Sequence, residues 1–118
     1  MLPVANRLRT SNEFSQTTKT GVRATSTSLV LYVLTKPELP TGPKVGLIIN
    51  KSIGGSVLRH RLARQIRHIM RRELELFPKN SFVVVRVLRS SDSLALELPK
   101  LAKKVLQNGS ARGGSVRV

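Results

Sequence analysis

The chain of 118 residues has no cysteine and no tryptophan, one tyrosine, three phenylalanines and only six acidic residues. Without cysteine it can form neither a disulfide framework nor a thiolate metal site, which fits a reducing cytoplasm. Long apolar runs are also missing. The N-terminal MLPVANRLRT has no apolar core of signal-peptide length, and no run approaches the length of a membrane span. We therefore expect a cytoplasmic protein with no membrane partner.

The scarcity of acids leaves a large excess of positive charge. The chain has 21 lysines and arginines, and its formal net charge is +15. Such a charge repels itself in a compact fold unless a polyanion neutralises it. The length suits one domain. We expect a folded domain over residues 1–108, followed by a small, basic and aperiodic tail over residues 109–118 that is disordered.

The apolar pattern predicts the element order helix, three strands, helix, strand, helix. The strand, helix and strand within residues 44–88 imply a parallel pair, whereas the earlier strands can be joined by hairpins. The predicted fold class is α+β, with a single mixed β-sheet of about four strands and helices packed on it. The expected helices are Ser11–Thr20, Ser56 to about Phe77, and Ser93–Gln107; the expected strands are Val22–Ala24, Ser28–Leu34, Lys44–Asn50 and Ser81–Leu88.

Two of these helices carry clear boundary signals. Thr10 and Glu13 have the spacing of a capping box before the first helix. In the last helix, Pro99 marks a kink or the true start. Asn108 followed by Gly109 is a typical C-terminal stop, so the last helix is expected to end at Gln107.

The most informative segment is the expected middle helix. Residues 59–72 contain six arginines and two histidines but no acid and no lysine. At about 100° per residue, its apolar and basic residues fall on opposite sides. The apolar side holds Leu58, Leu62, Ile66, Ile69, Met70 and Leu76; the basic side holds His60, Arg61, Arg64, Arg67, His68, Arg71 and Arg72, with Arg59 at the boundary.

This basic side predicts a surface that binds the phosphate backbone of a nucleic acid. An ordinary solvated helix face mixes acids and bases at a spacing of four residues, whereas Arg64, Arg67 and Arg71 repel one another. The planar fork of arginine binds two phosphate oxygens at once. A merely solvated face and an anionic membrane surface are the alternatives. The second is disfavoured because neighbouring strands need the apolar side of the helix as a cover.

The loop before the helix adds to this surface. Lys51, Gly54 and Gly55 lead into a helix N-terminus, where free N–H groups and the helix dipole favour an anion. A Gly-Gly pair is also common in a plain turn. The loop lacks the pattern of a nucleotide-hydrolysing P-loop, so no small-molecule substrate is expected.

The sequence offers no convincing catalytic group. His60 and His68 are the only candidate general bases, and no carboxylate is placed to orient either of them. The scattered acids give no evident metal cage. We therefore predict no catalytic residue and no metal ligand in this chain.

The segment KSIGGSVLRHRLARQIRHIMRRE resembles the signature of the bacterial ribonuclease P protein component, a lysine and a glycine turn before an arginine-centred helix. The order ANRLR, an acidic-Phe helix, LVLYVL, KVGL and a late apolar strand also resembles that family, over about residues 3–107. The resemblance implies a left-handed β-α-β crossover, against the usual right-handed preference.

The resemblance also implies a function. The family's protein is a subunit of a ribonucleoprotein endonuclease that cleaves the 5′ leader from precursor tRNA, with catalysis in the RNA subunit and Mg²⁺ bound mainly by that RNA. The implied partners are the catalytic ribonuclease P RNA and precursor tRNA. The expected RNA-binding residues are Lys51, Gly54, Arg59, His60, Arg61, Arg64, Arg67, His68 and Arg71.

For the leader, Phe14 and Tyr32 match aromatic positions of a cleft over the sheet in that family, where a ring can stack on a base of any identity. The chain also departs from the family pattern. His60 and Gly55 stand where asparagine is common, Ala63 where lysine is common, and Thr18 where a second aromatic residue is expected.

Two other classes of function remain open at this point. One is a ribosomal or other structural RNA-binding protein with a similar α+β fold. The other is a transcription factor that places the arginine helix in a DNA groove, although the chain shows no helix-turn-helix pattern.

Overall fold

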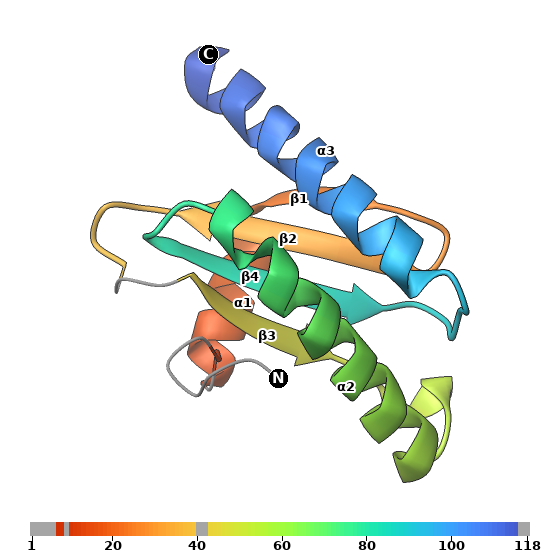
Figure 1. Ribbon diagram of the computed structural model, residues 1–118. Coiled ribbons are helices and arrows are strands. Elements are labelled where there is room, and N and C mark those ends of the chain that lie inside the picture. The colour runs from red at the N-terminus through yellow and green to blue at the C-terminus, as the bar shows by residue number, and fades with distance from the viewer. Residues whose placement is uncertain (1–6, 9, 40–42, 116–118) are drawn as a thin grey trace.

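The computed structural model describes residues 7, 8, 10–39 and 43–115 (Figure 1). Within them the elements follow the predicted order α-β-β-β-α-β-α, with two short 3₁₀ turns, η2 and η3, on either side of the second long helix. Their bounds are α1 Ser11–Thr20, β1 Val22–Thr25, β2 Leu29–Thr35, β3 Lys44–Ile48, η2 Lys51–Ile53, α2 Ser56–Glu73, η3 Leu74–Leu76, β4 Ser81–Val87 and α3 Leu94–Ser115.

The strands form one mixed four-stranded sheet in the order β1-β2-β4-β3. β2 pairs antiparallel with both β1 and β4, and β3 pairs parallel with β4. The predicted parallel pair is confirmed, and so is a hairpin between β1 and β2. β2 and β3 form no hairpin, because β4 lies between them. In Figure 1, β3 and β4 run in the same direction, α2 crosses on the viewer's side, and β4 lies above β3. This is the left-handed crossover that the family resemblance implied.

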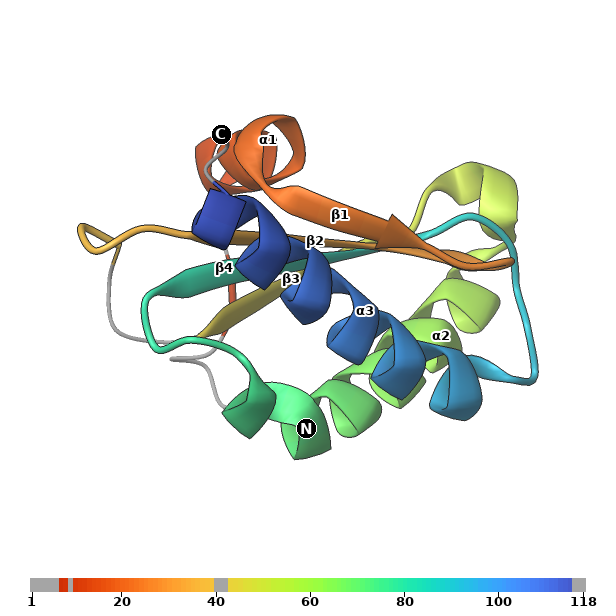
Figure 2. The same cartoon turned by 90° about the horizontal axis from the view of Figure 1, so that it is seen from above.

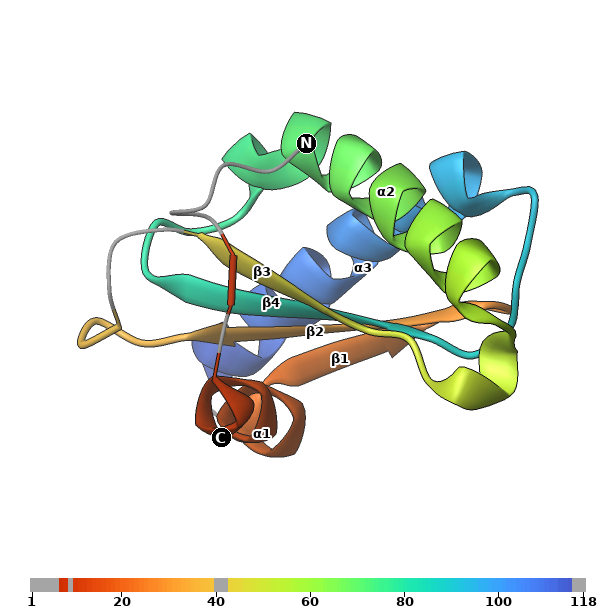
Figure 3. The same cartoon turned by 90° about the horizontal axis from the view of Figure 1, so that it is seen from below.

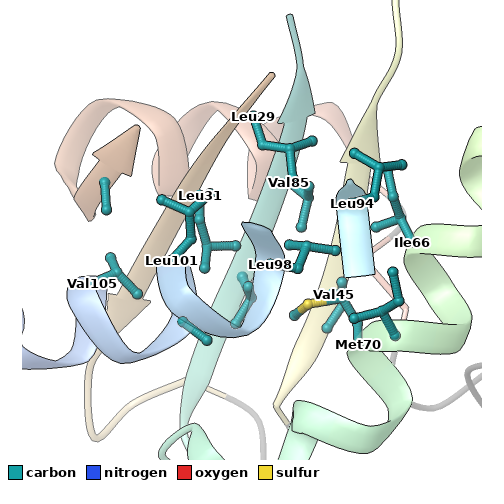
Figure 4. Packing of buried hydrophobic residues seen from close by; sticks show 14 of the residues in the cluster. Leu29, Leu31, Val45, Ile66, Met70, Val85, Leu94, Leu98, Leu101 and Val105 are labelled. Atoms are coloured by element: carbon teal, nitrogen blue, oxygen red, sulfur yellow. The ribbon is translucent and has the colours of Figure 1, made fainter. Parts of the chain in front are cut away.

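Helices cover both faces of the sheet. Figures 2 and 3 show α2 and α3 on one face and α1 on the other. Alternate residues of β2 point to opposite faces. Leu31 belongs to the larger core under α2 and α3, and Tyr32 to a smaller core under α1. Figure 4 shows Ile66 and Met70 of α2 and Leu98, Leu101 and Val105 of α3 meeting the sheet in the larger core.

Helix ends were the least accurate part of the sequence prediction. α2 ends at Glu73 rather than near Phe77, and η3 follows it. Pro78 disfavours helical geometry in the residue before it, so Phe77 is extended and buried in the larger core. Leu76, assigned to the apolar side of the helix, is 47% exposed.

The expected stop of the last helix was also wrong. α3 passes through Asn108 and Gly109 and ends at Ser115, with Pro99 inside it. The part of the expected disordered tail over residues 109–115 is therefore helical, and residues 116–118 lie outside the described residues. The division into an RNA-binding domain and a basic tail stays a prediction.

One carboxylate joins three segments of the chain. Glu97 Oε1 accepts hydrogen bonds from Ser26 Oγ at 2.6 Å and Ser28 N at 3.1 Å. Glu97 Oε2 accepts from Ser93 Oγ at 2.7 Å and Ser91 Oγ at 3.1 Å. Burial raises the pKa of Glu97, but these hydrogen bonds lower it further, to about 2. The charged carboxylate thus fixes the β1–β2 turn and the β4–α3 loop to the start of α3.

On the other face, Gly46 of β3 makes room for α1. A Cβ at Gly46 would overlap the ring of Phe14 and lie 3.0 Å from Leu8 Cβ. Leu8 N donates to Val45 O at 2.9 Å, so the segment before α1 lies along β3. The missing side chain allows the ring of Phe14 to rest directly on the strand.

We expect Glu97→Gln to lower the free energy of unfolding at pH 7 by about 1–3 kcal/mol. The amide NH₂ group takes the place of one acceptor oxygen, and the substitution removes the negative charge of the carboxylate. The folded-state pKa of about 2 lies below the ordinary 4.5, so the carboxylate stabilises the fold above pH 4.5. The difference from wild type should shrink as pH falls from 4.5 towards 2. Urea unfolding at several pH values measures it.

Glu75→Gln is the matched control, since Glu75 is exposed on η3. Its effect should stay within about 0.5 kcal/mol at every pH. An equal loss in both variants would mean that the hydrogen bonds to Glu97 do not stabilise the fold.

We expect Gly46→Ala to destabilise the protein by about 1–3 kcal/mol, because the added methyl group overlaps the ring of Phe14. The same change should cost less when Phe14 is already alanine. Urea unfolding of the wild type, both single variants and the double variant measures the coupling. An unchanged cost in the Phe14→Ala background would contradict direct contact as the cause.

Candidate nucleic-acid interface

α2 presents the two sides that its sequence predicted. Leu62, Ile66, Ile69 and Met70 are buried against the sheet and α3. The opposite side carries what we call the basic ridge: His60, Arg61, Arg64, His68, Arg71 and Arg72, all exposed, and Arg67, half-buried at its margin. No acidic residue lies between Gly54 and Arg72 in the chain. The ridge is therefore a row of like charges held on a packed helix.

The glycine turn before α2 is braced by an arginine. Arg59 Nε donates to Gly54 O at 3.2 Å, and Arg59 N donates to Gly55 O at 3.0 Å. A Cβ at Gly54 would lie 2.6 Å from Leu58 Cδ2, so this residue has little space for a side chain. Arg59 thus has a structural role that the sequence did not indicate.

The same turn leaves the start of α2 open to an anion. Gly55 is the N-cap residue, no side chain caps the helix, and no acid lies in its first turn. The N–H groups there and the positive end of the helix dipole point outward. Lys51 is exposed in η2, beside this turn. Lys51 and the N-terminus of α2 therefore extend the positive surface beyond the ridge.

The N-terminal segment adds a cation that sequence reasoning missed. Arg7 forms a parallel bridge with Val45 at the open edge of β3. Burial and the neighbouring charge of Arg7 both lower the pKa of Arg67. Periodicity could not reveal this proximity, because it arises from the path of the chain before α1.

The aromatic residues expected to contact a leader lie on the opposite face. Phe14 is half-buried, whereas Tyr32 is 7% exposed and packs in the smaller core. Of the two, Phe14 leaves more of its ring available for stacking. Thr18 is half-buried, and its hydroxyl donates to Ser15 O at 3.2 Å, so it provides no second ring.

Two arginines line this face of the sheet. Arg23 of β1 is paired with Tyr32, and Arg86 of β4 is paired with Val30. Both arginines are exposed and stand on the α1 side, because their strand neighbours point into the larger core. The position of Arg86 was missed because the other six residues of β4 are all buried, on both faces of the sheet, which conceals the alternation of the strand. Phe14, Arg23 and Arg86 form what we call the sheet-face strip.

The basic ridge and the sheet-face strip are separated by the thickness of the sheet. Figure 3 shows β3 between α2 on one side and α1 on the other. Arg7 lies along β3, at the edge that both surfaces share. A polyanion that passes this edge can contact both surfaces.

The described residues provide neither a metal cage nor an evident catalytic group. No group of three His, Asp or Glu side chains lies close enough within them to hold a metal ion. They therefore do not fit a Mg²⁺ site held by the protein alone. His60 and His68 are exposed, and in this part of the chain no carboxylate hydrogen bonds to either. No helix among the described residues is long and apolar enough to cross a membrane.

Comparison with known proteins agrees with this geometry. The family model described as Ribonuclease P matches residues 2–108. A ribonuclease P protein component of Mycobacteroides abscessus is 40% identical over 117 residues, covering 95% of this chain and 90% of the relative. One from Acidothermus cellulolyticus is 32% identical over 120 residues, covering 98% and 100%.

Solved structures show the same fold. The ribonuclease P protein of Staphylococcus aureus superposes with a TM-score of 0.68 at 19% identity, covering 89% of this chain and 95% of that chain. That of Thermotoga maritima gives a TM-score of 0.60 at 23% identity, covering 90% and 96%. The predicted α+β fold class is confirmed. These relatives do not favour a ribosomal protein or a transcription factor.

Proposed function

Since the chain belongs to the ribonuclease P protein family, the protein subunits of a tRNA-processing ribonucleoprotein enzyme, we propose that its basic ridge binds the catalytic RNA and that its sheet-face strip binds the 5′ leader of precursor tRNA. The observation that carries this proposal is the exposed row of arginines on α2, with no acid between Gly54 and Arg72 to offset it. The proposed complex is cytoplasmic, which fits a chain without cysteine.

The ridge is suited to a folded RNA rather than to single phosphates. Arg61, Arg64, Arg67 and Arg71 follow one helix over about 15 Å, from the rise of 1.5 Å per residue. Each guanidinium can bind two phosphate oxygens. The open N-terminus of α2 and Lys51 add a further anion site beside the ridge. We therefore propose Lys51, Gly54, Arg59, His60, Arg61, Arg64, Arg67, His68 and Arg71 as the residues of this RNA interface.

The sheet-face strip is suited to a single strand of variable sequence. A base stacked on a ring gains about 1–3 kcal/mol without reference to its identity, and Phe14 is the ring best exposed for this. Tyr32 is buried in the smaller core beneath this surface and supports it by packing. Arg23 and Arg86 place positive charge on the same face of the sheet as Phe14, where the backbone of a leader would run. This arrangement supports leader binding without sequence readout.

In this proposal the chemistry belongs to the RNA. Mg²⁺ bound by the RNA subunit would supply the charge stabilisation that phosphodiester cleavage needs. The protein lowers the repulsion between the catalytic RNA and its substrate by neutralising phosphates on both. Its contribution should therefore be largest where Mg²⁺ is scarce.

Reconstitution tests the function directly. We expect the protein to raise the rate of precursor tRNA cleavage, or the affinity for precursor tRNA, when it is added to cognate ribonuclease P RNA at low Mg²⁺. The gain in affinity should be larger for precursor tRNA than for mature tRNA, because only the precursor carries a leader. Cleavage assays and binding titrations measure both. Absence of any gain would refute the proposed function.

The ridge itself is tested by a double substitution. Arg64→Ala with Arg67→Ala should weaken RNA binding and reduce the slope of log K against log salt by about 1.4–1.8, from two lost phosphate contacts at about 0.7–0.9 each. The thermal unfolding midpoint should change little. Lys103→Ala with Lys104→Ala, which removes two exposed charges from α3, is the matched control and should alter the slope less. Equal effects of the two pairs would mean that only net charge matters.

A further inference from the structure

A recess lies beside the basic ridge, on the opposite side of the sheet from Phe14. It occupies about 370 Å³ between the N-terminal half of α2 and the β4–α3 loop. This volume is at the lower end of the roughly 300–1,000 Å³ typical of small-ligand sites, so it suits one nucleotide unit. Its lining comprises Leu58, Arg61, Leu62 and Gln65 from α2, and Ser90, Ser91 and Asp92 from the loop.

Asp92 is the informative member of this lining. It is one of only six acids in a chain of net charge +15, and it is exposed. Arg61 lines the same recess, yet these two described residues form no ion pair. A carboxylate only accepts hydrogen bonds, and it repels the phosphates that the ridge attracts. It is therefore suited to a group that presents donors rather than negative charge.

We propose that this recess binds an unpaired guanine base of the RNA partner, an inference that rests on the proposed function. The N1–H and N2–H₂ groups of guanine lie side by side and match the two oxygens of Asp92. Gln65 has an amide that can donate to guanine O6. Leu58 and Leu62 supply apolar surface for the ring, and Arg61 supplies a cation for the adjoining phosphate.

The other bases fit this lining less well. Adenine and cytosine each present an amino donor beside a ring acceptor, and uracil has one N–H between two carbonyl oxygens. None of them offers two adjacent N–H donors on its Watson–Crick or its Hoogsteen edge, the two edges that proteins read in unpaired RNA. If the Asp92 carboxylate faced the ring nitrogen acceptor of adenine or cytosine, their lone pairs would repel each other and no hydrogen bond would form. The lining therefore selects guanine.

The loop wall of the recess is held in place before any ligand arrives. Ser91 Oγ donates to Glu97 Oε2 at 3.1 Å, and Ser93 N donates to Ser91 Oγ at 3.0 Å. At the other end of the loop, Leu88 N donates to Ser28 O at 2.7 Å. A wall fixed in this way loses little conformational entropy on binding. Asp92 lies between Ser91 and Ser93 in the chain, next to the first of these anchors.

Fluorescence anisotropy with the full-length protein tests the inference. The probes are labelled uridine decamers in which one central position is uridine, guanosine, inosine or adenosine. We expect the guanosine decamer to bind about tenfold more tightly than the uridine decamer, the factor that one charge-assisted hydrogen bond commonly gives. Inosine keeps N1–H but lacks the N2 amino group, so its decamer should fall between the two.

Asp92→Asn should bring the guanosine decamer to within about twofold of the uridine decamer. Glu75→Gln removes an exposed acid near the other end of α2 and should leave the guanosine preference intact. If the acid acted through charge alone, Asp92→Asn would tighten binding of all four decamers alike. That result, or a guanosine preference that survives Asp92→Asn, would overturn the inference.

The outcomes also separate this inference from the function on which it rests. Steep salt dependence with all four decamers bound equally would refute the guanine site and leave the RNA-binding function standing. Failure to bind any decamer or the ribonuclease P RNA would refute both. A guanosine preference that is lost only in Asp92→Asn would support both.

Discussion

The burial of four apolar side chains of α2 against the sheet and α3 determines where the positive charges of this protein lie. Fully burying Leu62, Ile66, Ile69 or Met70 contributes about 1.5–3 kcal/mol each. Like charges one helical turn apart on the outer side cost only a few tenths of a kcal/mol per pair. The stabilisation from packing therefore exceeds the destabilisation from charge repulsion. The helix remains formed with its arginines directed outward. On a solvated loop these charges could move apart, whereas the packed helix holds them on one rigid surface.

The left-handed crossover determines which elements lie next to the basic ridge. Because β4 lies between β2 and β3, α2 sits above the β3 side of the sheet while α3 covers β1 and β2. α1 is then left alone on the reverse face, where the open part of the sheet exposes Arg23 and Arg86. One thin sheet thus separates the basic ridge from the sheet-face strip (Figures 2 and 3). Both surfaces reach the edge formed by β3.

The sequence predicted what local patterns encode. The period of α2 identified its buried side, and the apolar pattern predicted β2 as a strand within one residue of its bounds. Contacts between distant segments were not predictable in this way. Arg7 beside Arg67, Glu97 among serines from two other segments, and the recess between α2 and the β4–α3 loop all depend on tertiary packing. The stop expected at Asn108 failed because a local preference of about 1 kcal/mol is easily overridden.

The segment around Leu8 has a consequence for the isolated protein. An uncovered β-strand edge is a template for pairing with another molecule, and β3 would present such an edge on the sheet. The bond from Leu8 N to Val45 O occupies it, and Arg7 adds a charge there. The opposite edge, β1, has only four residues and carries Arg23. Both edge strands of the sheet thus disfavour edge-to-edge aggregation of the isolated protein.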